Sequence, residues 1–466
     1  MRWRSAVGAL VGLVAANLVA CSRPTPPPPA GVRDPGVRGG AAGAGKPLPG
    51  LTSDELAFFN DGRDRFLEIE SVTGSGNSGL GPRFNSNQCA SCHSQPGIGG
   101  TSPAGNPLIA VAALEGASNR VPWFITEDGP VREVRFKRTP AGTPDGGVHA
   151  LFVVTGRSDA PGCTISQPDF LPAGDPRTGR GGNPNVIFRI PTPVFGAGLI
   201  EAISDSTIVA NMTAGAAGNM RLGIYGHPNA HISGTANRSA NDGTITRFGW
   251  KAQNKSLLVF AGEAYNVEMG VTNQVFPQER DETPGCLFDA TPEDSLDFAA
   301  GRGAAVLSDT EAFANFMRLL APPTPSPDTP SIVSGRGLFT TTGCAACHTP
   351  SLTTGDRIAS GSATIPSVAL SHRTANLYSD LLVHDMGSGL GDGVTQGAAG
   401  PDEFRTAPLW GLGQRVFFLH DGRTTDLVDA IEAHRSRGSE ANQVIERFNR
   451  LSAREQQDIL DFLRSL

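Results

Sequence analysis

Apolar residues recur at helical spacing in three segments, each of which opens with a residue able to cap a helix. Thr52, Ser308 and Ser452 are each followed three positions later by Glu, the capping-box pattern that favours a helix N-terminus. We predict one helix that continues through residue 66, one that stops before Pro322, and one that occupies the last residues of the sequence.

The sequence Gly-Arg-x-x-Phe occurs twice, at 62–66 and 335–339, and each copy precedes a cysteine motif. Together with the closing helices, this predicts two related units, about 51–322 and 330–466. The first unit is much longer, so it must contain a large insertion.

This insertion spans about 100–300 and has a different pattern. Apolar, β-branched runs at 149–154 and 185–190 are separated by Gly and Pro turns. We therefore predict strands joined by long loops.

Composition excludes several classes of protein. The chain has 466 residues, 39% apolar and 18% charged, with 58 Gly and 36 Pro. This length suggests about three domain equivalents, and the composition is that of a loop-rich globular protein rather than a disordered chain. The net charge is −7 and no long basic run occurs, so nucleic acid is not an expected partner.

The first residues have the pattern of an export signal. Arg2 and Arg4 precede an apolar run, 6–16, that is too short to span a bilayer and is followed by Leu-Val-Ala-Cys ending at Cys21. This ending resembles a bacterial lipobox, in which the cysteine is acylated and becomes the mature N-terminus. The alternative is an ordinary signal peptide with a chance cysteine. Residues 22–50 are rich in Pro and Gly and are predicted to form a tether.

We therefore expect residues 1–21 to be a lipoprotein signal peptide and the protein to be bound to a membrane through its lipid. Ser22 follows the cysteine, and resemblance to sorted lipoproteins then implies the outer membrane. The expected location is the periplasmic side of the cell envelope.

Two C-x-x-C-H motifs carry most of the chemical information. They comprise Cys89, Cys92 and His93, and Cys344, Cys347 and His348. On a helical turn both thiols lie on one face, where they can add to the vinyl groups of a haem, and the next residue offers an imidazole to the iron. A thioredoxin-type pair or half of a zinc site would not explain a His after both pairs. We expect two covalently attached c-type haems with His93 and His348 as proximal ligands.

The expected fold is therefore mainly α, with two cytochrome c-like domains, irregular loops and a β-containing insertion. Two further cysteines, Cys163 and Cys286, each lie in a Pro-Gly-Cys turn. In an oxidising compartment a leftover pair usually bridges, so we predict a disulfide between them.

Several motifs resemble the bacterial di-haem oxidoreductase family, whose members are also described as peroxidases or thiol oxidoreductases. The resemblance runs from about Leu51 to Leu466, and the motifs that carry it lie at 79–85, 248–252, 268–273, 382–387 and 404–413. More distantly, the family is similar to di-haem cytochrome c peroxidases, tryptophylquinone-forming enzymes and rubber oxygenases. The resemblance implies that one haem relays electrons while the other meets the oxidant.

The resemblance also implies a second ligand for the C-terminal haem. In the peroxidases, an element like the one around His420 is followed fourteen positions later by a distal ligand, usually Met, and here that position is His434. His434 shares one predicted helical face with Leu427, Ala430 and Ile431. Two imidazoles would give a closed, low-potential haem, whereas the alternative is an ordinary core histidine.

The N-terminal haem lacks such a candidate, because no His occurs between His93 and His149. Its sixth position is therefore expected to be open to peroxide or dioxygen. Expected lining residues are Trp250, Tyr265, Glu268 and Met269. Peroxidase relatives hold a pocket carboxylate that moves a proton, so the catalytic candidates are Glu268, Trp250 and Tyr265; an ordinary hydrogen-bonded role for Glu268 is the alternative.

Other residues near the second haem have mainly structural interpretations. His384, His420 and Arg405 are expected to pair with propionates or to fix the loop between domains. Asp385 and Asp392 lie in a Gly-rich segment and are candidate ligands for Ca²⁺, although no regular calcium motif is present.

Trp410 is a candidate for interdomain packing or electron relay. His227 and His231 are read as loop residues, because Pro228 opposes a shared helical face, and His149 has no assigned role.

Three functions follow from these observations. The leading one is an oxidoreductase that activates peroxide or another small oxidant at the N-terminal haem while the C-terminal haem relays electrons from a soluble or membrane partner. The alternatives are a non-catalytic electron-transfer lipoprotein and an oxygenase that acts on an apolar substrate.

Overall fold

The computed structural model describes residues 31–73, 79–170, 185–230, 245–281, 283–356, 358–360, 363–365 and 367–466. About a third of them are helical and the sheets are small, so the fold is mixed rather than mainly α. The expectation overstated the helix content because the chain is rich in glycine. Many glycines adopt positive φ and turn the backbone instead of continuing a helix.

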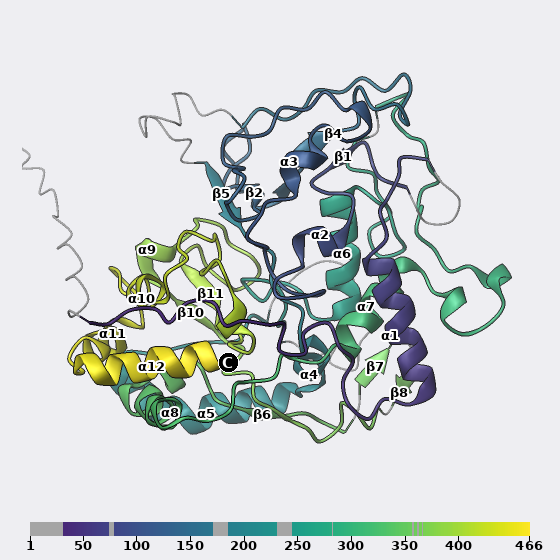
Figure 1. The fold of residues 1–466 in the computed structure, drawn as a ribbon. Coiled ribbons are helices and arrows are strands. Elements are labelled where there is room, and N and C mark those ends of the chain that lie inside the picture. Colours follow the sequence, from purple (N-terminus) through teal and green to yellow (C-terminus); the bar gives the residue numbers. More distant parts are fainter. Residues whose placement is uncertain are drawn as a thin grey trace, which may run out of the picture.

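The elements run along the chain as follows (Figure 1). The helices are α1 Ser53–Phe66, α2 Cys89–Cys92, α3 Leu108–Val111, α4 Ala197–Ala202, α5 Asp205–Leu222, α6 Leu257–Met269, α7 Asp309–Leu319, α8 Pro330–Thr342, α9 Gly387–Leu390, α10 Leu427–Glu432, α11 Asn442–Phe448 and α12 Ala453–Ser465. The strands are β1 Arg83–Phe84, β2 Glu133–Phe136, β3 Val148–His149, β4 Phe152–Val153, β5 Val186–Arg189, β6 Leu352–Thr353, β7 Ile358–Ser360, β8 Ala363–Ile365, β9 Thr374–Ala375, β10 Val383–Asp385 and β11 Glu403–Arg405.

The predicted helix starts are confirmed. Thr52 and Ser452 form complete capping boxes at α1 and α12, and the Ser308 side chain caps α7. The strands expected in the insertion are also present, but they are short: β3, β2 and β5 form one antiparallel sheet, and β1 pairs with β4. Small antiparallel pairs also occur in the C-terminal half, where no strands were predicted.

Two helix pairs repeat one packing arrangement (Figure 1). Helix α1 packs on α7, and α8 packs on α12. The glycine of each Gly-Arg-x-x-Phe copy lies at the crossing: a Cβ on Gly62 would stand 2.1 Å from the carbonyl oxygen of Ala312, and one on Gly335 would stand 1.9 Å from that of Asp458. The repeated glycine is therefore required for the two helices to approach each other.

The phenylalanine of each copy lies beside the motif histidine. Phe66 stands 6.0 Å from the ring of His93, and Phe339 stands 6.2 Å from the ring of His348, measured between ring centroids. The repeat in sequence thus corresponds to a repeat in structure.

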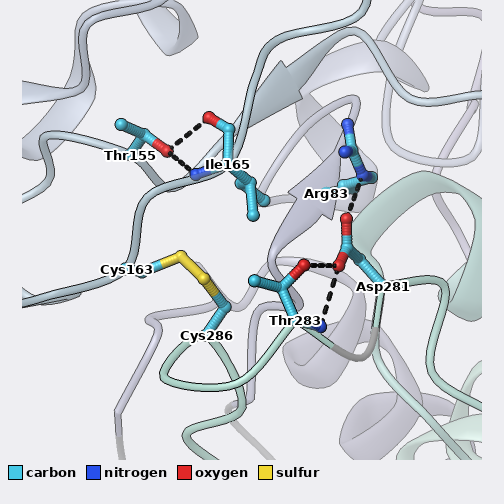
Figure 2. The surroundings of a disulfide bond; sticks show 7 residues. All are labelled: Arg83, Thr155, Cys163, Ile165, Asp281, Thr283 and Cys286. Carbon is cyan, nitrogen blue, oxygen red and sulfur yellow. Dashed lines mark hydrogen bonds and ion pairs between the residues drawn. A yellow bond between two sulfur atoms is a disulfide. The ribbon is translucent and has the colours of Figure 1, made fainter.

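The disulfide between Cys163 and Cys286 is present and links the loop after β4 to the loop after α6 (Figure 2). Both loops are also held by polar contacts. The Thr155 hydroxyl donates to the carbonyl of Ile165 at 2.7 Å, and Arg83 Nε contacts Asp281 at 2.6 Å.

The segment before α1 differs from the prediction. Residues 1–30, which include Cys21, lie outside the described residues, but from residue 31 onward the chain is not a free tether. Asp34 forms an ion pair with Arg464 and accepts from the backbone N–H of Leu427, and Arg38 donates to the Ser465 carbonyl at 2.8 Å. These contacts bind the segment along the C-terminal unit despite its Gly and Pro content. Within the described part of the chain, every helix is too short or too polar to cross a membrane.

Candidate functional site

The first C-x-x-C-H motif opens into a large cavity of the N-terminal unit. Cys89 and Cys92 occupy α2, and both line this cavity of about 1220 Å³ together with His93. This volume includes space that is open to solvent.

The second motif lines a separate cavity of about 1420 Å³ in the C-terminal unit. Cys344 begins a short 3₁₀ turn, Cys344–Ala346, and Cys347 and His348 follow it. His434 lines this same cavity, as do the three residues predicted to share its face, namely Leu427, Ala430 and Ile431. Helix α10 ends at Glu432, so the His434 imidazole projects from the turn after the helix rather than from the helix itself.

Three histidines share one hydrogen-bonding arrangement. The Nδ1 atoms of His93, His348 and His434 lie 2.9, 2.9 and 2.8 Å from the backbone carbonyl oxygens of Gly100, Tyr378 and Ala430. Such a bond orients the ring and keeps the proton on Nδ1, which leaves Nε2 as the ligating atom. Burial lowers the pKa of all three imidazoles, that of His348 to about 4, so they are held in the neutral form that binds iron.

Two buried arginines provide a test of whether the C-terminal cavity suits a haem. Arg405 and Arg415 both line it, and burial lowers the pKa of each guanidinium to about 10. Within the described residues neither has a carboxylate partner, and Arg405 Nε donates only to the Gly249 carbonyl. Two buried, unpaired cations are costly in isolation, whereas they match the two propionate groups of a haem. The cavity therefore fits this cofactor. Sequence reasoning found Arg405 but missed Arg415, which lies in no motif.

The N-terminal cavity has a different chemical character. Trp250, Tyr265, Glu268 and Met269, the four residues expected to line it, all do so. Among the described lining residues, His93 is the only histidine. Three carboxyl groups share this wall: Glu133, Glu263 and Glu268.

Glu268 lies deep in this cavity near the end of α6. Asn85 Nδ2 donates to its Oε2 at 2.7 Å, and its carboxyl group is hydrogen-bonded to that of Glu133. Burial and the Glu133 charge raise the pKa of Glu268 to about 8. Glu133 was missed by sequence reasoning, because nothing in its strand distinguishes it before β2 is seen beside α6.

Tyr265 is more enclosed than expected. Its hydroxyl donates toward Glu70 and Asp309, at 3.0 and 3.2 Å, and burial raises its pKa well above the ordinary value. Tyr265 therefore lines the cavity as predicted, while its hydroxyl group is hydrogen-bonded to two buried carboxyl groups.

Trp250 lines both cavities. Its indole N–H donates to the carbonyl of Ile190 at 2.9 Å, and its ring meets that of His420 edge-on at 6.3 Å between centroids. Trp410 is buried against Gly196 in the N-terminal core, which agrees with interdomain packing.

The contacts of Asp392 do not support the calcium expectation. Asp392 lies 2.7 Å from Arg189 and 3.2 Å from Lys251, while Asp385 accepts from the backbone of Gly387. Lys251 Nζ also donates to the carbonyls of Gly400 and Glu403, so a lysine ammonium occupies this group of oxygens. The described residues contain no group of three acidic, His or Cys side chains suited to a metal ion.

Four other histidines have structural partners. His384 lies between Asp380 and Glu440, His227 contacts Glu403, and His149 contacts Asp145. His420 stacks on Phe404. His231 lies outside the described residues.

Two motif-lined cavities in one chain define a protein built to hold two haems, and comparison with known proteins identifies the family. The model of the family described as "Di-haem oxidoreductase, putative peroxidase" matches residues 179–466, and the chain belongs to this family. Membership of this family implies that the chain binds haem cofactors.

Two solved structures are similar to parts of the chain. One is the diheme peroxidase BthA from Burkholderia thailandensis E264, at 15% identity and a TM-score of 0.28 over 47% of this chain and 65% of that one, less than two thirds of its length. The other is hydrazine synthase from Kuenenia stuttgartiensis, at 19% identity and a TM-score of 0.22 over 50% of this chain and 84% of that one. No curated protein matches the sequence significantly.

Proposed function

We propose that this protein is an exported c-type cytochrome with two covalently attached haems that reduces peroxide or another small oxidant at its N-terminal haem. The C-terminal haem relays electrons from a soluble or membrane donor. One observation carries the proposal: His434 and two further histidines, His384 and His420, line the C-terminal cavity with His348, whereas His93 is the only histidine among the described lining residues of the N-terminal cavity, where three carboxyl groups share the wall.

When bound, the two haems supply iron centres that accept electrons singly and deliver them to the oxidant. The protein residues have separate tasks. His348 and His434 both line the C-terminal cavity and would hold the haem iron there, while Arg405 and Arg415 would bind its propionates. His93 would hold the iron in the N-terminal cavity.

Reduction of hydrogen peroxide to two waters consumes two electrons and two protons. Glu268 is the group placed to deliver protons in the N-terminal cavity, because it carries a proton at neutral pH. Trp250, which borders both cavities, is the residue placed to couple electron transfer between them.

The wider organisation is part of the same proposal. The two helix pairs, α1 with α7 and α8 with α12, correspond to two cytochrome c-like domains, and Cys21 carries a lipid that holds the protein on the periplasmic side of the outer membrane. Replacing Cys21 by Ser should release the protein into the soluble periplasmic fraction, and unchanged membrane association would count against lipidation.

The activity is tested with the purified holoprotein, a reduced one-electron donor and peroxide. We expect peroxide-dependent oxidation of the donor, inhibited by cyanide, and a loss of about 100-fold or more in Glu268→Gln. A protein with no turnover whose two haems both resist cyanide and CO would instead be an electron-transfer lipoprotein. Oxygen-dependent cleavage of an apolar substrate would identify an oxygenase.

A further inference from the structure

Glu133 and Glu268 reach the N-terminal cavity from different elements. Glu133 begins β2 and Glu268 lies near the end of α6, and their carboxyl groups are hydrogen-bonded to each other. Two carboxylates cannot both remain ionised at hydrogen-bond distance, so this pair holds one shared proton.

The surroundings decide which of the two carries it. Arg135 Nε donates to Glu133 Oε1 at 2.6 Å, and the charge of Arg189 also faces Glu133. Glu268 instead receives the neutral amide of Asn85, whose orientation is set because its Oδ1 accepts from the Leu151 N–H at 2.7 Å. The arginines stabilise the carboxylate form of Glu133, and the proton therefore belongs to Glu268.

Other charged groups near the pair do not change this assignment. Arg280 faces Glu268, but its guanidinium donates to the carbonyls of Val267 and Val148, both at 2.5 Å. Glu263 faces Arg135 and is held by Asn254 at 2.5 Å.

We propose that Glu133 is a positioning residue that keeps Glu268 protonated and reloads it after each proton transfer. The inference rests on the proposed peroxide reduction. When Glu268 gives its proton to the departing hydroxide, two carboxylates face each other, and their repulsion draws the next proton from solvent. Each peroxide takes two electrons from the external donor and two protons through Glu268, and two waters leave.

The pair is tested first without turnover, by infrared difference spectra of the holoprotein across a pH titration. Wild type minus Glu268→Gln should show the C=O band of a protonated carboxyl group that disappears as pH rises through about 8. In Glu133→Gln the repulsion is gone, so this band should titrate at least about one pH unit lower. Absence of the band at neutral pH, or an unshifted titration in Glu133→Gln, would overturn the proposal.

The second readout is the pH profile of peroxide reduction. The alkaline limb of this profile should shift with the infrared band, to lower pH in Glu133→Gln. In Glu133→Asp, which restores the negative charge, the limb should largely return to its wild-type position. This rescue shows that the shift is not caused by misfolding. Glu263→Gln, on the same wall but bonded to Asn254, is the matched control and should leave the limb in place. A limb that moves equally in both Gln variants contradicts a specific role for Glu133. If the band behaves as expected but the protein does not reduce peroxide, the proposed function is wrong. The shared proton between Glu133 and Glu268 is then still supported.

Discussion

The two cavities share one motif and differ in almost everything that surrounds it. In the C-terminal cavity His434 joins His348, with His384 and His420 also in the lining, and the nearby cations Arg405 and Arg415 lack carboxylate partners among the described residues. In the N-terminal cavity His93 is the only histidine among the described lining residues, and three carboxyl groups share the wall. The C-x-x-C-H sequence therefore specifies where a haem is attached, while the residues opposite it specify what that haem does.

The largest expected effect concerns haem content, because the two sites should load independently. Replacing both Cys344 and Cys347 by Ala should remove one covalently bound haem and leave the other, as measured by mass spectrometry of the denatured protein. The corresponding change at Cys89 and Cys92 should remove only the N-terminal haem. Loss of both haems in either variant would contradict two independent sites.

Removal of the disulfide should have the next largest effect, and it should destabilise the first unit more than the second. The disulfide joins residues 123 positions apart within the first unit, and chain-entropy estimates for a loop of this size give about 4 to 5 kcal/mol. Cys163→Ser with Cys286→Ser should lower the free energy of unfolding by up to that amount in denaturant titrations. The absorption of the C-terminal haem should change last as denaturant rises, and simultaneous loss of both haem signals would argue against separate stability.

The stability of the N-terminal unit should also depend on pH. Burial and nearby carboxylates raise the pKa of Glu70 to about 8, above its ordinary value of 4.5. A group whose pKa is raised by folding contributes stability that is complete below the unfolded pKa and is lost as pH rises through the folded one. The free energy of unfolding should therefore fall between about pH 5 and pH 8, by on the order of a few kcal/mol. Glu70→Gln should reduce this slope, to which Glu268 also contributes, and an unchanged slope would exclude Glu70 as one of its sources.

The smallest effects come from the repeated glycines. Gly62→Ala should strain the contact of α1 with α7, and Gly335→Ala that of α8 with α12, each at about 1 to 3 kcal/mol. Gly337→Ala is the matched control in α8, because nothing lies within 4 Å of its added Cβ. It should be neutral or slightly stabilising, by about 0.5 to 1 kcal/mol. Equal destabilisation by all three in thermal unfolding would refute the close-approach explanation.

Short-range signals predicted much of the fold. The capping boxes located α1 and α12, and the Gly-Arg-x-x-Phe repeat located the two helix pairs, because these patterns act within a few residues of one another. Contacts between residues far apart in the sequence could not be predicted from local patterns. The ion pair of Asp34 with Arg464 turns an expected tether into a bound segment, and no local pattern indicates it.

The candidate site shows the same limit. The spacing from His420 led to His434, and the resemblance led to Glu268, and both line the expected cavities. Glu133 and Arg415 were missed because their importance depends on which side chains they face. A strand glutamate and a loop arginine acquire chemical meaning only once the fold has brought them beside Glu268 and Arg405.

We expect one haem to be closed by two imidazoles and the other to be open. Electron paramagnetic resonance of the oxidised protein, recorded with and without cyanide, tests it most directly. We expect one low-spin, cyanide-resistant haem that is lost in His434→Ala, and one haem that binds cyanide in both proteins. Two low-spin, cyanide-resistant haems in the native protein, or a low-spin signal that survives in His434→Ala, would contradict it.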